Sequence, residues 1–144
     1  GDGVLQQFTH NSYSARRSNT LSTGNAIRGG FAGTPGVGAL ALQLQPGARL
    51  QAEIIAGIDD GLLVQDVTGI HSGVNPISGD FSTGAAGLMI RGGALAEPVR
   101  EFTIASTLQR MLLDIVEVGA DVDWLPMRAA GVSLVIGDVT MSGV

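Results

Sequence analysis

The stretch from Gly61 to Gly93 constrains the fold more than any other part of this chain. Two mostly apolar runs, Leu62 to Val67 and Ala85 to Ile90, enclose a loop from Gly69 to Thr83 that is rich in Gly, Ser, Asn and Asp. Short apolar runs bounded by turn residues indicate strands. The loop has no hydrophobic period, and it is longer than the usual connection in a compact domain. We therefore expect two strands and an ordered loop that faces a cavity or a subunit partner.

A hairpin is predicted directly after this loop. Residues Gly84–Ile90 and Val99–Ala105 are its expected strands, and Arg91, Gly92 and Gly93 form its turn, because paired glycines supply the positive φ angles of a tight turn. Pro98 stands at the expected start of the returning strand, where a missing N–H does least harm.

The next segment predicts a helix that begins at Ser106 and ends at Gly119. Ser106 and Gln109 have the spacing of a capping box, in which two side chains satisfy free N–H groups at the helix start. Its apolar residues Leu108, Met111, Leu112, Ile115 and Val116 follow a helical period. The helix is expected to pack on the sheet through Leu108, Met111, Leu112 and Ile115.

The remaining segments predict short elements separated by turns. The expected strands are Val4–His10, Ala39–Leu44, Val132–Ile136 and Val139–Ser142, the last two around a Gly137-Asp138 turn, and the expected helices are a segment capped by Asn11 or Ser12 through Arg17, and Arg49–Ile58. Ser18–Gly38 is expected to be a loop, and Asp121–Arg128 a connector with Trp124 as a packing anchor. The predicted class is α+β, with one domain over residues 1–144, a mainly antiparallel sheet, two or three helices, and closure toward a barrel as an open alternative.

Composition excludes several functional classes. The net charge is −5, all eight basic residues are Arg, and an acidic chain without a basic cluster argues against a nucleic-acid surface. The absence of Cys excludes disulfides and is compatible with the cytoplasm. No apolar run is long enough to span a membrane, and no signal peptide is visible. Because the chain begins with Gly1, we expect a fragment of a longer protein.

The sequence offers few groups for catalysis. His10 and His71 are the two histidines, they lie far apart in the chain, and neither belongs to a His-Glu-x-x-His pattern, which would place two metal ligands on one helix face. Without Cys, a metal site would also need Asp ligands. We therefore expect no catalytic residue and no metal ligand in this chain.

Several motifs, in order along the chain, resemble one known family. Gly73-Val74-Asn75-Pro76, Ser78-Gly79-Asp80-Phe81-Ser82 and Gly84-Ala85 resemble the loop signature of the TldD/PmbA family, metallopeptidase-related proteins also known as modulators of DNA gyrase. The resemblance extends through Ser12-Tyr13-Ser14-Ala15-Arg16-Arg17 and Ser22-Thr23-Gly24-Asn25-Ala26 upstream, and Thr103-Ile104-Ala105 and Val118-Gly119-Ala120-Asp121 downstream. It covers nearly the whole chain, as the C-terminal domain of a longer protein.

This resemblance implies a cytoplasmic role in proteolysis. TldD-type members carry a His-Glu-x-x-x-His motif upstream of this region and a zinc-ligating Cys near the C-terminus. Residues Val118 to Gly131 cover the place of that Cys and contain none, so the chain is similar to the PmbA (TldE) branch. The implied function is a zinc-free subunit that helps bind unfolded peptide, with zinc held by a TldD-type partner. A homodimer is the other implied assembly, and an assembly module without a substrate role is the alternative function.

The candidate site lies in the central loop. Asn75, Ser78, Asp80 and Ser82 are expected to form a wall that contacts peptide, because short polar side chains bond nearby backbone groups and fix loops. His71 is a weaker candidate. It could bind substrate or carry protons near neutral pH, but a loop histidine bonded to backbone is the favoured interpretation.

Overall fold

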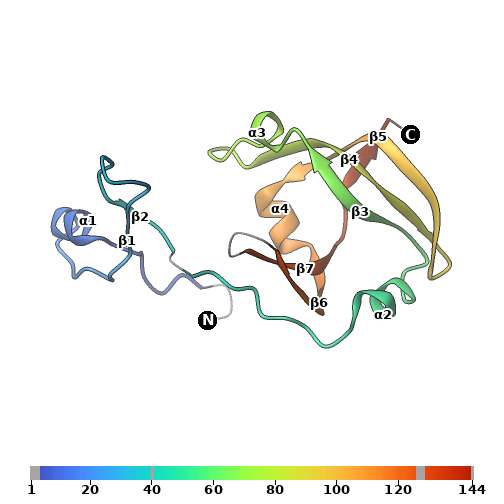
Figure 1. Ribbon diagram of the computed structural model, residues 1–144, viewed down its shortest axis with the longest axis horizontal. Coiled ribbons are helices and arrows are strands. Elements are labelled where there is room, and N and C mark those ends of the chain that lie inside the picture. Colours follow the sequence, from blue (N-terminus) through green and yellow to red (C-terminus); the bar gives the residue numbers. More distant parts are fainter. Residues whose placement is uncertain (1–3, 40, 126–128, 144) are drawn as a thin grey trace. The chain divides into compact units, whose positions relative to one another are not determined.

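The computed structural model describes residues 4–39, 41–125 and 129–143 (Figure 1). The chain forms two compact units, Gly1–Leu44 and Gln45–Val144. Each unit has its own secondary structure and is described separately below.

The first unit is organised around the N-terminal cap of a short helix. It contains α1 (Ser12–Arg17) and a two-stranded ribbon of β1 (Ala26–Ile27) and β2 (Gly36–Val37). Asn11 is the predicted cap: its Oδ1 accepts from the Ser14 N–H at 2.8 Å, and its own N–H donates to the Ser14 hydroxyl at 3.1 Å. The buried Asn11 amide also donates to the carbonyls of Pro35 and Gly36, which ties α1 to the ribbon.

Two predicted strands are absent from this unit. Val4–His10 has no regular structure, and neither do residue 39 and residues 41–44 of the predicted Ala39–Leu44 strand. A strand needs a partner, and the hydrophobic alternation of both segments is too imperfect to specify one. The His10 carbonyl instead accepts hydrogen bonds from the Thr23 and Asn25 N–H groups, as part of a loop.

A four-stranded antiparallel sheet forms most of the second unit. Its order is β3 (Asp60–Thr68), β4 (Asp80–Arg91), β5 (Ala94–Thr107) and β8 (Thr140–Ser142). The predicted β4–β5 hairpin is confirmed, and φ angles of 54° and 78° at Gly92 and Gly93 form its turn. Pro98 lies inside β5 rather than at its start, beside register shifts that interrupt the pairing with β4, the setting in which a sheet tolerates proline.

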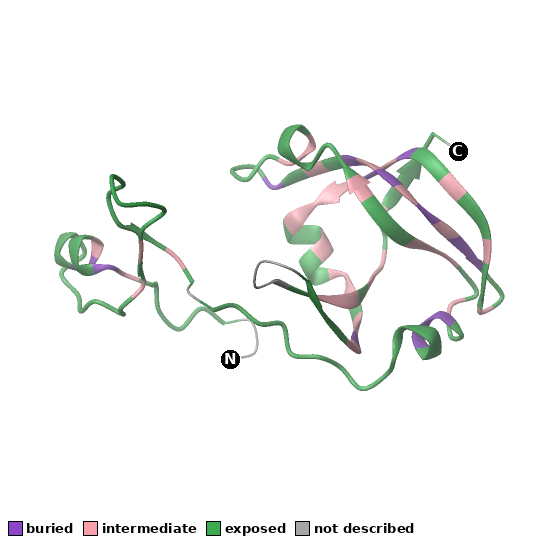
Figure 2. Ribbon diagram, viewed as in Figure 1, coloured by how far each residue is buried: buried purple, intermediate pink, exposed green. Residues whose placement is uncertain are grey.

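The hydrophobic core lies on one face of this sheet. Alternate residues of β4, including Thr83 and Ala85, are buried, whereas Asp80 and Ser82 point to the other face (Figure 2). Ala85, Phe102 and Ile104 form the core cluster. Partly buried apolar side chains surround it, namely Leu62, Val67, Phe81, Val99 and Val139.

The predicted helix after β5 is much shorter than expected. α4 spans Leu108–Leu113, its cap is Thr107 rather than Ser106, and the Thr107 hydroxyl accepts from the Arg110 N–H at 3.1 Å. Residues from Ile115 onward form β6 (Ile115–Leu125), paired with β7 (Ala129–Ile136) in a separate antiparallel sheet. The β-branched side chains at Ile115 and Val116 favour extended backbone, and pairing with β7 overrides the helical spacing.

The prediction that this helix packs on the sheet through Leu112 is therefore wrong. Leu112 is 71% exposed, and none of the α4 side chains is buried. We expect Leu112→Ala to change the free energy of unfolding by less than about 0.5 kcal/mol, because an exposed side chain makes few packing contacts that its removal could lose. Urea titration of the chain and its variant would measure the difference. A loss of about 2 kcal/mol or more, typical of a buried leucine, would contradict this orientation of α4.

The segment before β3 is joined to β6 by hydrogen bonds and an ion pair. α2 (Gln51–Ile55) is shorter than the predicted Arg49–Ile58 helix, and it buries Ile54 and Ile55. The Gly47 N–H donates to the Gly119 carbonyl, the Ala120 N–H donates to the Arg49 carbonyl, and the Arg49 guanidinium pairs with Glu117. Hydrogen bonding to Arg49 lowers the pKa of Glu117 below its ordinary value.

The predicted connector after residue 120 is also a strand. β6 continues to Leu125, and Trp124 is 74% exposed, so it is not a packing anchor within this structure. The last part of the predicted connector, residues 126–128, lies outside the described residues. Val132–Ile136 is confirmed as part of β7 and Val139–Ser142 largely as β8, but the two strands belong to different sheets.

Asp121 joins β6 to β7. Its Oδ2 accepts from the Ser133 hydroxyl at 2.6 Å and from the Ser133 N–H at 3.3 Å, and the Gln51 amide donates to that hydroxyl at 2.8 Å. The hydrogen bond from the Ser133 side chain is the main reason that the pKa of Asp121 lies below its ordinary value, against an opposing effect of burial.

This shift predicts acid sensitivity. A carboxyl group with a lowered pKa in the folded state stabilises the fold above its unfolded pKa, and that stability is lost as the pH falls through the folded value. We expect the free energy of unfolding to decrease as the pH is lowered below about 4, the ordinary range for Asp. Asp121→Asn should show a shallower decrease in urea titrations at pH 7, 4 and 3. Identical pH profiles for the two proteins would contradict the role of Asp121.

The predicted fold class is confirmed as α+β with antiparallel strand pairing. In the described ranges the strands form three sheets that do not close into a barrel, and the helices are four in number and short. None of the helices in the described residues is long and apolar enough to cross a membrane.

Candidate functional site

The predicted loop between the two central strands contains more regular structure than its sequence indicates. Its first part is the one-turn helix α3 (Ile70–Gly73), and its last four residues already belong to β4. Only residues 74–79 form an irregular turn, and Val74 makes a bridge to Phe81 across its base. The candidate site is therefore a six-residue turn next to the start of β4, and we call it the 74–79 turn.

Asn75 gives the 74–79 turn its shape. Its Oδ1 accepts hydrogen bonds from the N–H groups of Ile77 and Ser78, at 2.9 and 3.2 Å. Its backbone N–H donates to the Asp80 carbonyl at 2.9 Å, and its carbonyl accepts from the Gly79 N–H at 2.8 Å. One asparagine thus makes four hydrogen bonds that close the turn, as side-chain oxygens of Asn commonly do in loops.

Ser78 and Asp80 form a second, exposed pair in the same place. The Ser78 hydroxyl donates to Asp80 Oδ2 at 2.6 Å, and both residues are exposed. Three of the five predicted site residues, Asn75, Ser78 and Asp80, are therefore connected by hydrogen bonds. A carboxylate and a hydroxyl held in this way can accept and donate hydrogen bonds to a polar ligand.

The other two predicted residues flank this group. Ser82 lies two residues beyond Asp80 on the exposed face of β4, and α3 packs closely there, because a Cβ on Gly73 would overlap the Ser82 carbonyl. His71 is exposed on α3. Within the described residues its imidazole makes no hydrogen bond to backbone, and the residue lies on a helical turn rather than in a loop.

Sequence reasoning missed one residue at this site, Gln109. It was expected to complete a capping box with Ser106, but its side-chain Nε2 donates to the Ser78 carbonyl at 3.2 Å. The neighbouring Leu108 N–H donates to the Gly79 carbonyl at 2.7 Å. The N-terminal turn of α4 therefore attaches to the 74–79 turn, and the sequence contains no local signal for a contact between residues so far apart.

The described residues do not bring a set of metal-ligating side chains together. In the described parts of the chain, no three His, Asp or Glu side chains gather closely enough to share a metal ion. His10 belongs to the first unit and His71 to the second.

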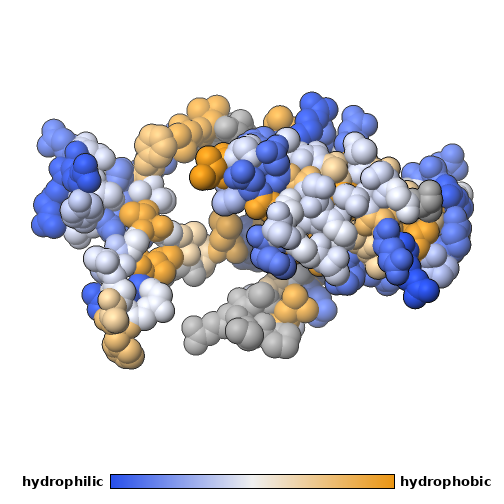
Figure 3. All heavy atoms as spheres, turned by 90° about the horizontal axis from the view of Figure 1, so that it is seen from above, coloured by the Kyte–Doolittle hydropathy of each residue, from blue (hydrophilic) through white to orange (hydrophobic). Residues whose placement is uncertain are grey.

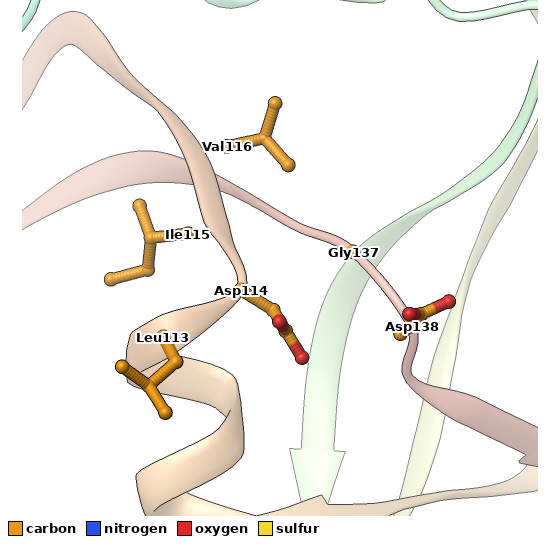
Figure 4. Close-up of a pocket in the computed structure, with 6 residues that line it drawn as sticks. All are labelled: Leu113, Asp114, Ile115, Val116, Gly137 and Asp138. Carbon is orange, nitrogen blue, oxygen red and sulfur yellow. The ribbon is translucent and has the colours of Figure 1, made fainter.

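A shallow open hollow lies elsewhere in the second unit, at the junction of α4, β6 and the turn after β7 (Figure 4). Leu113, Ile115 and Val116 line it together with Asp114, Gly137 and Asp138. Asp114 already accepts a hydrogen bond from Arg110 Nε at 2.6 Å. The hollow therefore holds two carboxylates, Asp114 and Asp138, of which Asp114 is committed to Arg110, and its other side chains are apolar. We regard it as a poorer candidate for a polar ligand than the 74–79 turn.

Comparisons with known proteins agree on one family. Residues 1–143 match the family described as the PmbA/TldA metallopeptidase C-terminal domain. The chain is 37% identical to the metalloprotease PmbA of Escherichia coli O157:H7 over 123 residues. This alignment covers 85% of this chain and 24% of that protein.

Two crystal structures are similar to this chain over nearly its full length. One is a Thermotoga maritima protein named as a candidate modulator of a DNA gyrase, with a TM-score of 0.83 and 33% identity over 98% of this chain and 31% of the other. The second is TldE from Thermococcus kodakarensis, with a TM-score of 0.84 and 28% identity over 99% of this chain and 32% of the other. The chain spans about a quarter to a third of these relatives, and it belongs to the PmbA/TldD metallopeptidase family as its C-terminal domain.

Proposed function

We propose that this chain is the C-terminal domain of a zinc-free, PmbA/TldE-type subunit that helps bind unfolded peptide for proteolysis by a TldD-type partner in the cytoplasm. The observation that carries this proposal is the 74–79 turn. It presents Ser78 to solvent beside Asp80, the first residue of β4, in a geometry fixed by Asn75 and by α4. A polar segment that is both exposed and internally braced suits ligand contact, because little entropy is lost when a ligand binds to it.

The edge of the neighbouring sheet supplies a second element for peptide binding. β3 is the outermost strand beside β4, and it ends at Thr68, just before α3 and the 74–79 turn. An extended peptide can add to such an edge through main-chain hydrogen bonds, largely independent of its sequence. A peptide on β3 would run toward the 74–79 turn, where the exposed side chains would contact it.

Proteolysis itself is assigned to the partner. The family is one of metallopeptidases, whereas the described residues of this chain assemble no metal-ligand cluster. We therefore place zinc in a TldD-type subunit, with a homodimer as the alternative assembly. This chain would contribute binding and no proton transfer.

Site-specific crosslinking tests this proposal. A photoreactive amino acid at Ile77, which is exposed at the tip of the turn, would be introduced into the full-length subunit assembled with its partner. An unstructured casein peptide should be labelled at this position, and an excess of unlabelled peptide should suppress the labelling. The same probe at Phe31, an exposed residue of the first unit, serves as the matched control. Equal labelling at both positions, or none at Ile77, would refute a peptide site at the turn.

A second function is favoured by a different observation. Large apolar side chains of α4, β6 and β7 are exposed, namely Leu112, Leu113, Val116, Trp124, Leu125 and Leu134. In the view of Figure 3, apolar residues are interspersed with hydrophilic ones on the surface. Exposed apolar residues in such numbers suit a subunit interface. In this alternative the chain is an assembly module without a substrate role. Trp124→Ser would then abolish assembly, while crosslinking of peptide to the turn would be absent in the wild-type complex.

A further inference from the structure

Two sets of hydrogen bonds hold the 74–79 turn, one made by Asn75 and the other donated by residues of α4. The bonds of Asn75 lie within the turn or at its base, so they fix its shape. The bond from the Asn75 N–H to Asp80 and the bridge between Val74 and Phe81 attach the base of the turn to the start of β4. The second set comes from the start of α4, where the Leu108 N–H and the Gln109 side chain reach the carbonyls of Gly79 and Ser78.

The contact with Gln109 is tight as well as hydrogen-bonded. Gly79 is buried and has a φ of +85°, a conformation that suits glycine. A Cβ on Gly79 would overlap the amide group of Gln109. The Gln109 amide therefore packs against the backbone of the turn beside the exposed Ser78–Asp80 pair.

We propose that Gln109 is a positioning residue for peptide binding, which orients the 74–79 turn relative to the edge of the sheet. This inference rests on the proposed function, in which the turn contacts peptide. Without the Gln109 amide, the turn would keep its internal bonds, its bridge to Phe81 and its bond from Leu108, but it would lose the contact that holds Ser78 against α4. Peptide affinity would fall, and the chemistry at a metal centre in the partner would be unchanged.

Gln109→Glu isolates this role from folding. The carboxylate has nearly the same size as the amide, but it cannot donate a hydrogen bond to the Ser78 carbonyl. Glu is also a good helix former, and a negative charge is favourable in the first turn of a helix. α4 should therefore persist in the variant. Gln51→Glu is the matched control, because Gln51 also donates from its amide, to Ser133, but in a different part of the unit.

The experiment measures KM and kcat for a casein peptide with the full-length subunit assembled with its partner. Loss of one hydrogen bond corresponds to a roughly threefold to tenfold rise in KM, with kcat unchanged. Amide exchange at Leu108 should also accelerate, because its N–H donates to Gly79 of the same turn. Gln51→Glu should leave both quantities at the wild-type values.

The outcomes separate this inference from the proposed function. If the wild-type turn crosslinks to peptide but Gln109→Glu has an unchanged KM, Gln109 has no positioning role. A parallel fall in kcat and in thermal stability would indicate a purely structural role, and it would also overturn the inference. If the wild-type complex fails to crosslink peptide at the turn, the proposed function is wrong, and the inference fails with it.

Discussion

Replacing Phe102 with alanine is expected to lower the free energy of unfolding by about 3–5 kcal/mol, the usual cost of truncating a buried aromatic side chain. Phe102 lies on β5, is 1% exposed, and packs with Ala85 and Ile104 in the core cluster. Truncation leaves a cavity against the face of a sheet in which pairing with β4 fixes the backbone of β5, so the site cannot collapse easily. Urea or thermal unfolding of the chain would measure the loss.

Phe31→Ala provides the control for this measurement. Phe31 is fully exposed, at 103% of its reference area, so the same chemical change should alter the free energy of unfolding by less than about 0.5 kcal/mol. Similar losses for the two variants would mean that Phe102 is not the centre of the core. That outcome would contradict the face assignment of β5.

The second large effect is expected on activity. Asn75→Ala removes the side-chain oxygen that accepts from the Ile77 and Ser78 N–H groups. Each hydrogen bond contributes about 0.5–1.5 kcal/mol, so loss of the two should reduce kcat/KM for a casein peptide by about tenfold. The thermal midpoint should change little, because both N–H groups lie at an exposed turn and can bond to water. Asp80→Ala should have a smaller effect, since the Asp80 carbonyl still accepts from Asn75.

Asn75→Asp is the matched control, because it keeps an acceptor oxygen at the same position. Proteolysis by the assembled complex containing this variant should stay close to the wild-type rate. Full activity in Asn75→Ala would leave the 74–79 turn as an ordinary connection. A fall in the thermal midpoint that parallels the loss of activity would assign Asn75 to folding alone.

The sequence predicted the elements whose signals are local. The cap at Asn11, the glycine turn at Gly92 and Gly93, and the strands on either side of the central loop depend on neighbouring residues, and the structure contains all of them. The prediction of a long helix was wrong because Ile115 and Val116 satisfy both a helical period and the composition of a strand. Pairing with the distant β7 decided between the two structures.

At the candidate site, too, the sequence predicted the local contacts but not the long-range one. Hydrogen bonds between Asn75, Ser78 and Asp80 connect residues within one turn, and short-range side-chain chemistry predicts them. The contact of Gln109 joins residues 31 positions apart. This contact forms because β5 runs antiparallel to β4 and ends beside the start of β4, which places α4 next to the turn. Such a contact follows from the three-dimensional fold and has no signal in a short stretch of sequence.

The first unit buries very little apolar surface in its described residues, and this has a thermodynamic consequence. Within its described residues Ala15 is the buried apolar side chain, while the buried Asn11 amide and the His10 carbonyl hold the loops together. The heat-capacity change of unfolding scales with the apolar surface that becomes exposed. Melting of this unit would therefore add almost nothing to the heat-capacity step of the chain. A calorimetric scan would detect the unfolding of the sheet around Phe102. Unfolding of residues 10–38 would be detected only by probes of individual hydrogen bonds.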